Sequence, residues 1–507
     1  MLRRNVLANV LGGSWWAALS LLIIPFQVRV LGVEAYGLLA FLASVQILLS
    51  IFDFGLSPAI TRAVTMDAST DLVASGRLAG IVSVGYAVFG ICLGLLLIAS
   101  SGWLAGHWLH LERLPVQTVA TAIRLGGVAI ALRWPVSFLS GAIAGRQRFD
   151  LLNLLRAGVA SFAVVGGIGA ILVTHDLLAY LTWMAVSAAV EVAAYAAITV
   201  RLLPSVIQLH VRSLTDARSV FAFAAGINLI NLLSMLLTQS DRLLISKVLG
   251  IQSLGYYALA YNIVFGLTLI QTFVTSAMFP AFVSSHSSDD QDRFRSRYRD
   301  ASQALMYVYN FPIWLLIFFG IDLLGVLSTP ATAAHSAPIL SVLALGFLCN
   351  SSAALAYTAS IASGRTRLPI VVNVVAVIFY IPLLAVLTLR WAGLGAAIAW
   401  LVLNLFYLPT LLLRVHRTLL GIATLDWLRT GFLPFVLLGL ACFGSAKLGR
   451  ILILPDALIA NAALGAIAGI AYLGLGFRLL RPSLRAGLQS SVAEIRRGFI
   501  RPGGSAA

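Results

Sequence analysis

Long apolar runs follow one another along almost the whole of this 507-residue chain. Runs of 18 or more apolar residues begin near Val6 and recur as far as Arg481. In a bilayer such runs must be helical, because a helix satisfies its own backbone hydrogen bonds where there is no water. Only 10% of the residues are charged and the mean hydropathy is +0.98, whereas soluble domains carry about 25% charged residues. The chain is therefore predicted to be an all-α, polytopic membrane protein.

Breaks at Gly, Pro and charged residues divide the apolar sequence into about 14 predicted transmembrane helices. The first is longer than the apolar core of a signal peptide and lacks a small-residue cleavage site, so we expect it to remain as a helix. The spans lie near 7–30, 36–57, 78–100, 118–143, 157–174, 177–201, 220–246, 254–283, 303–328, 337–362, 368–389, 392–414, 430–448 and 457–479.

The loop charges test this span count independently, because hydropathy does not use them. With a cytoplasmic N-terminus, 25 of the 34 Lys and Arg residues fall in segments on the inner side. This agrees with the excess of Lys and Arg that cytoplasmic loops carry. An even number of spans with both termini cytoplasmic is predicted. The net charge of +16 is thereby assigned to membrane topology, and no nucleic-acid partner is expected.

Two motifs recur at nearly the same offset. "VLGVEAYGLLAF" at 30–41 returns as "VLGIQSLGYYAL" at 248–259, which pairs Gly32 with Gly250 and Gly37 with Gly255. "GRQRFDLLN" at 145–153 returns as "GRTRLPIVV" at 364–372. Two matches of this kind indicate a duplicated six-helix unit. Because six is even, both copies enter the membrane in the same orientation, and a pseudo-two-fold axis along the membrane normal is expected.

The predicted organisation is thus two six-helix lobes followed by an appendix. The lobes occupy 1–214 and 215–420, and residues 421–507 supply two further transmembrane helices and a basic cytoplasmic tail. The segment at 287–302, "SSDDQDRFRSRYRDAS", is interpreted as a short amphipathic helix on the inner surface after the eighth span.

Four stretches resemble a known family. They are "VLGVEAYGLLAF", "FDFGLSPAITR" at 52–62, "AGRQRFDLLN" at 144–153 and "SDRLLISKVLGIQSLGYYALAYNI" at 240–263. They are similar to the bacterial polysaccharide transporters, the Wzx-type O-antigen and exopolysaccharide flippases. These belong to the multidrug/oligosaccharidyl-lipid/polysaccharide superfamily of exporters. The resemblance covers roughly residues 1–415.

The resemblance implies an inner-membrane flippase for cell-surface polysaccharide biosynthesis. Its cargo would be an undecaprenyl-pyrophosphate-linked oligosaccharide, moved from the cytoplasmic to the periplasmic leaflet by alternating access. The implied partners are that lipid-linked oligosaccharide, membrane lipids, H⁺ or Na⁺ as coupling ion, and polysaccharide polymerase machinery.

Two other classes of function stay open. An ion-coupled exporter of drugs or small cations would share the superfamily, but it would need several carboxylates inside the lobes, and the charges within the spans favour arginine. A polytopic glycosyltransferase would need carboxylates in a substantial outer loop, where the first two outer loops offer only Glu34 and Glu112. No P-loop, HExxH or GxSxG motif occurs, so neither an enzymatic activity nor a cofactor is expected. The cysteines and histidines are scattered, and no metal site is expected.

Charges inside membrane spans are costly and usually face a cavity or a partner. Arg133 lies nearest to mid-membrane, so we expect it to bind the anionic cargo or to pair with Glu191 on the sixth span. Glu191 could instead change its protonation during transport. Arg124 is nine residues from Arg133, which puts it half a turn out of phase, and it could equally reach the interface as a snorkelling side chain.

Further candidates form three groups. Arg242 and Arg29 are candidate substrate-binding residues near the outer ends of their spans. Asp241, Asp53 and Asp322 are candidates for ion coupling or structural pairing, with Asp241 and Arg242 alternatively forming an ion pair at the helix end. The inner corners of the two lobes carry arginines that the topology alone can explain but that could also contact a lipid headgroup: Arg146, Arg148, Arg365 and Arg367.

Overall fold

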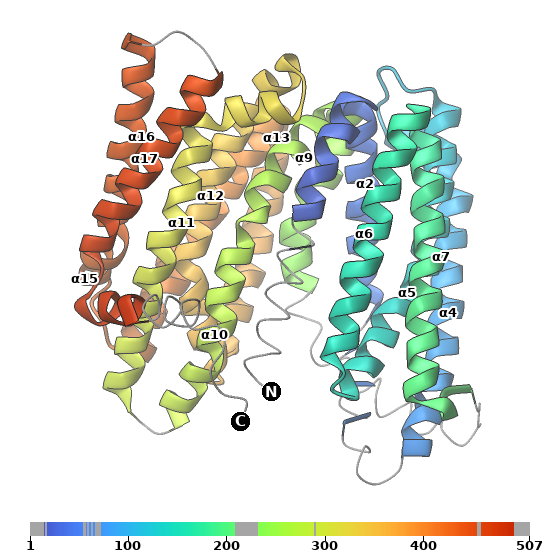
Figure 1. Cartoon of the computed structure of the whole chain (residues 1–507), viewed down its shortest axis with the longest axis horizontal. Helices are drawn as coiled ribbons and strands as arrows, with labels where there is room; N and C mark the ends of the chain where they lie inside the picture. The colour runs from blue at the N-terminus through green and yellow to red at the C-terminus, as the bar shows by residue number, and fades with distance from the viewer. Residues whose placement is uncertain are drawn as a thin grey trace, which may run out of the picture. The chain divides into compact units, whose positions relative to one another are not determined.

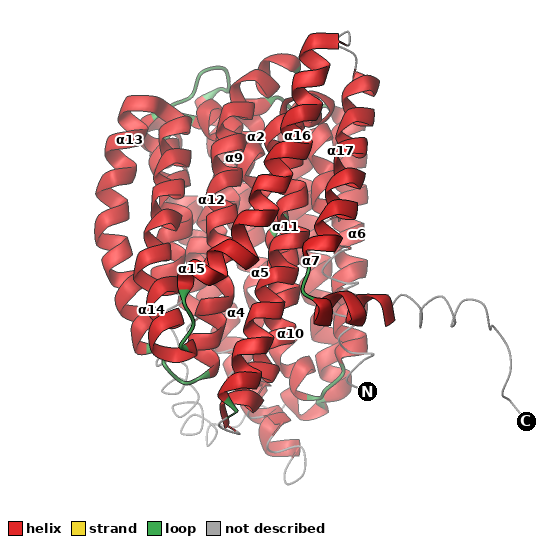
Figure 2. Cartoon of the chain, turned by 90° about the vertical axis from the view of Figure 1, so that its left-hand side faces the viewer, coloured by secondary structure: helices red, strands yellow, loops and turns green. Residues whose placement is uncertain are grey.

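The computed structural model describes residues 15, 18–53, 57, 60–61, 64–65, 72–207, 232–287, 290–453 and 458–490. Throughout these residues the secondary structure is helical and contains no strand (Figure 2). Eleven helical segments among them are long and apolar enough to cross a membrane, and a shorter apolar helix runs over Ala18–Arg29. The prediction of an all-α, multi-pass membrane protein is confirmed.

The predicted spans match these segments closely. The segment Arg367–Leu420 holds the two predicted spans at 368–389 and 392–414. They meet where Trp391 and Ala392 leave the helical conformation. The first and seventh predicted spans correspond to the helices at 18–29 and 232–248, and the rest of each lies outside the described residues.

The chain forms two compact units. Unit 1 comprises Met1–Leu259, Val326–His335 and Asn373–Ala396, and unit 2 comprises Ala260–Gly325, Ser336–Val372 and Ala397–Ala507. The boundary predicted between residues 214 and 215 falls outside the described residues. The two six-helix lobes and their pseudo-two-fold axis therefore stay predictions.

Unit 1 is built mainly from long helices, and its two short 3₁₀ turns extend helix ends. Helix α5 packs against both α4 and α7, and α7 also packs against α6 (Figure 1). Besides the helices at 18–29 and 232–248, this unit holds α2 (Val33–Leu49) with a 3₁₀ turn (Ser50–Asp53), α4 (Leu72–Trp103) with a π turn (Leu104–Trp108), α5 (Val116–Gly145), α6 (Phe149–Thr174), α7 (Leu177–Leu202) with a 3₁₀ turn (Pro204–Ile207), and the first part of α9 (Ile251–Gly266).

The two copies of the first repeat contact each other inside unit 1. A Cβ atom added at Gly37 would lie 2.0 Å from the carbonyl oxygen of Ile251, and one added at Gly255 would lie 2.2 Å from that of Val33. Val33 and Gly37 occupy the same places in the first copy as Ile251 and Gly255 do in the second. The close approach is therefore reciprocal, and it requires glycine on both sides. Each copy also begins with a glycine at φ near +90°, Gly32 and Gly250, a conformation that glycine alone adopts easily.

The two copies of the second repeat differ in backbone conformation. Its first copy turns through Gln147 at φ +57°, whereas its second copy turns through Gly364 at φ +72°. Gly145, the sequence partner of Gly364, is the last residue of α5. The two turns thus place their left-handed residue at different points of the motif, although both lead into the next long helix.

Unit 2 contains the remaining long helices and the short helical turns that follow α13. Its elements are α10 (Thr268–Ser287), α11 (Gln291–Leu327), α12 (Pro330–Ala362), α13 (Arg367–Tyr407), a π turn (Leu408–Leu412), α14 (Leu413–Val415), a π turn (His416–Leu420), α15 (Thr424–Trp427), a π turn (Leu428–Phe432), α16 (Leu433–Ile453) and α17 (Leu458–Leu479). Parts of α11, α12 and α13 extend into unit 1.

The interpretation of 287–302 as a separate surface helix is wrong. Helix α11 begins at Gln291 and continues without interruption to Leu327. Its first turns are anchored because Phe294 and Tyr298, one turn apart, are fully buried and pack against Phe282 of α10. Arg297 donates hydrogen bonds to the Ala281 carbonyl and to Ser285. The charged residues of this segment occupy the solvent-facing side of a helix whose other side is core.

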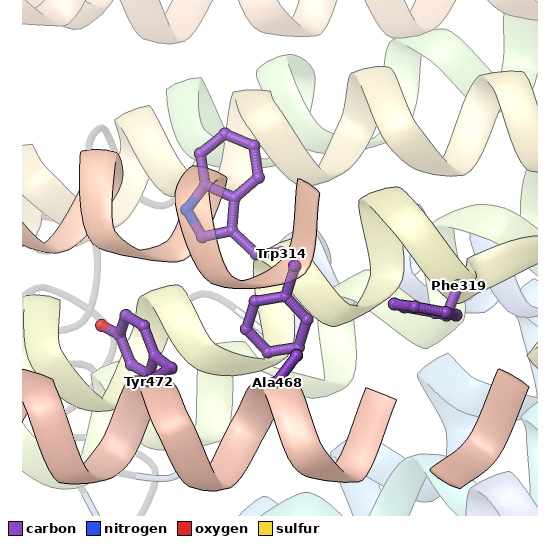
Figure 3. Close-up of a cluster of buried hydrophobic side chains, with 5 residues drawn as sticks. Trp314, Phe319, Ala468 and Tyr472 are labelled. Atoms are coloured by element: carbon purple, nitrogen blue, oxygen red, sulfur yellow. The ribbon is translucent and has the colours of Figure 1, made fainter. Parts of the chain in front are cut away.

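The two C-terminal helices pack onto α11. Figure 3 shows Trp314 and Phe319 of α11 beside Ala468 and Tyr472 of α17, with Phe443 of α16 completing the cluster. The hydroxyl group of Tyr472 donates to the Tyr307 carbonyl at 2.9 Å, so the polar end of this buried ring is satisfied. The predicted appendix is therefore an integral part of the unit 2 core.

Candidate transport site

A polar cavity of about 140 Å³ lies inside unit 1 among helices that are otherwise apolar. Helix α5 contributes Arg133 and Ser137, which are one turn apart and so share a face. Helix α2 contributes Gln46, and the 3₁₀ turn that follows it contributes Ser50 and Asp53. Helix α4 adds Tyr86. Ile130 and Trp134 supply apolar wall. The cavity thus brings together one cation, one carboxylate and several uncharged hydrogen-bonding groups.

Arg133 forms the ion pair with Glu191 that the sequence predicted. Its Nε lies 3.0 Å from a carboxylate oxygen of Glu191 on α7, and the two side chains are 25% and 20% exposed. Arg133 stands near the middle of the 30-residue helix α5. An unpaired arginine at such a position costs about 2.5–3.5 kcal/mol on insertion scales, and the pair offsets part of that cost. Among the described residues the terminal nitrogens of Arg133 form no hydrogen bond, so the guanidinium keeps donors for another group.

Asp53 lines the same cavity. One of its carboxylate oxygens accepts a short hydrogen bond from the hydroxyl group of Tyr86, and the other accepts from Ser137 at 3.4 Å. The Tyr86 hydroxyl also lies 2.8 Å from the main-chain oxygen of Asp53. The ring of Tyr86 packs against Phe138 and Trp134, which orients its hydroxyl group toward Asp53. Asp53 is therefore held by donors that are themselves fixed by α4 and α5.

The remaining candidates of unit 1 lie apart from this cavity. Nε of Arg124 donates to Ser101 on α4 at 3.1 Å, so the two arginines of α5 have partners on different helices. Nε of Arg29 donates to the Ser328 carbonyl at 3.1 Å. Arg148 forms a bidentate pair with Asp150, but both side chains are 46% exposed, and exposed pairs contribute little to stability. Arg146 lies at the end of α5, half-buried.

Asp241 and Arg242 are both buried in unit 1. The carboxylate of Asp241 accepts a hydrogen bond from the Tyr257 hydroxyl group at 2.5 Å and another from the main-chain N–H of Arg242 at 2.7 Å. Tyr257 belongs to α9, so Asp241 links the helix at 232–248 to its neighbour. This arrangement supports the expectation that Asp241 finds a partner on another helix.

In unit 2 the candidate residues lie in two different places. Asp322 of α11 accepts a hydrogen bond from Asn461 of α17 at 2.8 Å and so joins the C-terminal helices to the core. Arg365 and Arg367 stand at the turn between α12 and α13, where they line a second cavity. That cavity also contains Arg414, which the sequence did not single out.

Sequence reasoning missed several polar residues of the sites. Gln46, Tyr86 and Ser137 are ordinary residues of apolar helices, and nothing in their local sequence marks them as cavity-lining. Glu34 was noted only as a loop carboxylate, yet it is 5% exposed and accepts hydrogen bonds from the main-chain N–H groups of Glu112, Arg113 and Leu114. The available signal was an acidic residue at the start of an apolar run, the place that becomes the first turn of α2.

The chain matches known proteins along most of its length. The profile of a family described as "Polysaccharide biosynthesis protein" matches residues 2–286, and the MatE profile matches residues 227–386. A Shigella flexneri protein named "Putative O-antigen transporter" is 24% identical over 436 residues, which are 84% of this chain and 97% of that protein.

Solved transporters share the fold. The lipid II flippase MurJ in an inward closed conformation matches with a TM-score of 0.68 at 14% identity and covers 94% of this chain and 100% of its own. An inward-facing multidrug resistance transporter of the MATE family matches with a TM-score of 0.64 at 12% identity, over 82% of this chain and 95% of its own. At these identities the likeness is one of fold. With the first profile matching more than half of its residues, the chain belongs to the polysaccharide biosynthesis protein family.

Proposed function

We propose that the protein is a flippase for a lipid-linked oligosaccharide. It moves an undecaprenyl-pyrophosphate-linked glycan from the cytoplasmic to the periplasmic leaflet of the bacterial inner membrane, with both termini in the cytoplasm. The family match, the O-antigen transporter relative and the fold shared with a lipid II flippase support this function. The single structural observation that carries it is the arginine at the middle of α5 that faces a polar cavity.

Arg133 provides the chemistry that an anionic headgroup requires. A pyrophosphate that crosses the membrane needs a compensating cation near the midplane, and a guanidinium can bind two phosphate oxygens at once. Because Glu191 engages Nε, the terminal nitrogens of Arg133 are the groups that bind the headgroup. Glu191 keeps the arginine in place when the cavity is empty and exchanges with the phosphate when it is filled.

Asp53 is the candidate coupling residue of the same cavity. A carboxylate beside hydroxyl donors can take up a proton or a sodium ion, and its neutralisation changes the net charge of the cavity that Arg133 also lines. Since the chain has no P-loop, the driving force is an ion gradient of H⁺ or Na⁺ or downhill flux of the cargo. The polysaccharide polymerase machinery is the partner that receives the translocated glycan.

A gene deletion tests the function directly. We expect the deleted strain to lose surface polysaccharide and to accumulate lipid-linked oligosaccharide, and a plasmid carrying the wild-type chain to restore both. The variant Arg133→Ala should insert into the membrane normally but fail to restore the surface glycan. Full surface polysaccharide in the deletion strain would contradict the proposal.

An exporter of cationic drugs is the second candidate. The MatE match over 227–386 and the carboxylate in the cavity favour it. The same deletion strain separates the two functions, because an exporter would make the strain more sensitive to ethidium and fluoroquinolones while surface polysaccharide stayed unchanged. We expect drug sensitivity to be unaffected.

A further inference from the structure

A second cavity, of about 470 Å³, lies in unit 2 where α12 ends and α13 begins. Three arginines from three segments line it. Arg365 lies in the turn between the two helices, Arg367 is the first residue of α13, and Arg414 belongs to α14. The rule that cytoplasmic loops collect Lys and Arg explains their presence at this end of the unit. It does not explain why residues about 50 positions apart in the sequence line one cavity.

Acidic side chains of the described segments leave these three arginines unneutralised. Among the residues that the structure describes, none of the three has a carboxylate within 4.0 Å. Arg365 is held in position because its terminal nitrogen donates to the Thr418 carbonyl at 2.9 Å and its own carbonyl accepts from Ser360 at 2.8 Å. Three guanidinium groups around one cavity create a positive potential that attracts an anion. The N-terminus of α13 adds the positive end of a helix dipole at the same place.

Apart from Ser360 and Thr418, the rest of the lining is apolar. Leu368 and Val371 of α13 and Val415 and Leu419 of the segment after it form this apolar wall. A soluble anion would gain nothing from these side chains. A lipid whose anionic headgroup joins an apolar chain matches both parts of the lining. Arginine also suits phosphate in particular, since its planar fork can bind two phosphate oxygens.

We propose that this cavity binds the phosphate headgroup of a lipid. Two lipids carry this chemistry: the diphosphate-linked prenyl cargo and the anionic phospholipids of the bilayer. Binding of the cargo rests on the proposed flippase function and would make the cavity a docking site before transport. Binding of a phospholipid does not rest on it and would make the cavity a site through which membrane composition controls unit 2.

Native mass spectrometry of the purified full-length protein tests the proposal. The probes are undecaprenyl diphosphate, phosphatidylglycerol and, as a lipid without net charge, phosphatidylcholine. The test variant is Arg367→Gln combined with Arg414→Gln, because within the described part of the chain neither side chain has an ion-pair partner that the change would leave unpaired. The matched control is Arg417→Gln. Arg417 is an exposed arginine three residues after Arg414, and it does not line the cavity.

We expect the double variant to bind the phosphate lipids about tenfold more weakly than the wild type, since it lacks two charge-assisted contacts. The control should bind as the wild type does, and phosphatidylcholine should not distinguish the three proteins. A loss confined to undecaprenyl diphosphate identifies the cargo as the ligand. A loss confined to phosphatidylglycerol, or shared equally by both, identifies a general anionic-lipid site that stands even if the flippase function is refuted.

Unchanged binding of both phosphate lipids by the double variant overturns the proposal. Each protein is first checked for a single symmetric peak in size-exclusion chromatography. If the double variant does not pass, Arg367→Gln and Arg414→Gln are measured singly, with an expected weakening of about threefold each. Single variants that bind like the wild type overturn the proposal in the same way.

Discussion

Arg133 and Glu191 lie on different helices, 58 residues apart, and meet as an ion pair inside unit 1. Their side chains are still 25% and 20% exposed, and Arg133 lines the cavity of unit 1. Full burial would make this pair a structural element alone, whereas partial exposure beside a cavity leaves room for exchange with an anionic group. Asp53 is the carboxylate that lines the cavity itself, and it receives its side-chain hydrogen bonds from hydroxyl groups.

The ion pair predicts how substitutions of Arg133 and Glu191 should change the stability of the protein. Arg133→Ala leaves Glu191 without its partner and should lower stability by about 1–2 kcal/mol, less than the 3–5 kcal/mol of a fully buried pair because both groups are partly exposed. Adding Glu191→Gln should recover most of that loss. Thermal unfolding in detergent of the wild type, the single variant and the double variant measures these differences in stability.

Transport should separate the two roles of Arg133. Arg133→Lys keeps the charge but loses the bidentate geometry, and we expect it to restore surface glycan partly. The double variant Arg133→Ala with Glu191→Gln should be stable yet inactive. If Arg133→Ala complements the deletion strain fully, the residue has no part in the transport path.

The repeated motif explains how α2 and α9 approach each other. Gly37 and Gly255 face the carbonyl groups of Ile251 and Val33 in a reciprocal contact, which no side chain could enter. In membranes, small residues permit such close backbone packing, and this packing contributes to helix association where the hydrophobic effect does not. The recurrence in the sequence is therefore matched by a local symmetry in the structure.

A single methyl group should disrupt this contact. Gly37→Ala places Cβ 2.0 Å from a carbonyl oxygen, so the helices must separate, and we expect a loss of about 1–3 kcal/mol. The matched control is Gly85→Ala on α4, where a Cβ atom meets nothing within 4 Å and helix propensity favours alanine. The comparison uses thermal unfolding in detergent. Equal stability of the two variants would argue that the α2–α9 contact is not close in the membrane.

Helix α13 carries a second local constraint. Ala392 stands at φ +50° and ψ −137°, a conformation that is unfavourable for any residue with a side chain. Replacement by glycine should therefore stabilise the protein by about 1 kcal/mol, while Ala392→Val should destabilise it. Measured melting temperatures should follow the order glycine, alanine, valine. Any other order would show that this break in the helix adopts a different backbone.

The whole chain is a multi-pass membrane protein whose long helices account for the predicted spans. A cavity in unit 1 is lined by Arg133 and Asp53, and a cavity in unit 2 is lined by three arginines and an apolar wall. The proposed topology puts the three-arginine cavity at the cytoplasmic end of unit 2, because it adjoins the turn after residue 362.

Reporter fusions test that topology. We expect a cytoplasmic signal from fusions after residues 150, 214, 292, 366 and 490, and a periplasmic signal after 110 and 333. Alkaline phosphatase and green fluorescent protein give opposite readings on the two sides and serve as controls for each other. A periplasmic signal at 366 would refute both the span count and the duplicated six-helix unit.

Hydropathy and loop charge were sufficient to predict the helical class and the approximate places of the spans, and the charges within the spans made Arg133 and Glu191 one of the expected pairings. The physical reason is that hydrocarbon permits only self-satisfied helices and makes each charge within them seek a partner. The same reasoning could not find Tyr86 beside Asp53, the loop held by Glu34 or the cavity shared by Arg367 and Arg414. These three arrangements depend on which faces of the helices pack together and at what depth. Packing between segments far apart in the chain decides this, and local periodicity does not encode it. The continuous α11 shows the same limit, because buried contacts of Phe294 and Tyr298 with α10 turned a charged segment into the start of a membrane helix.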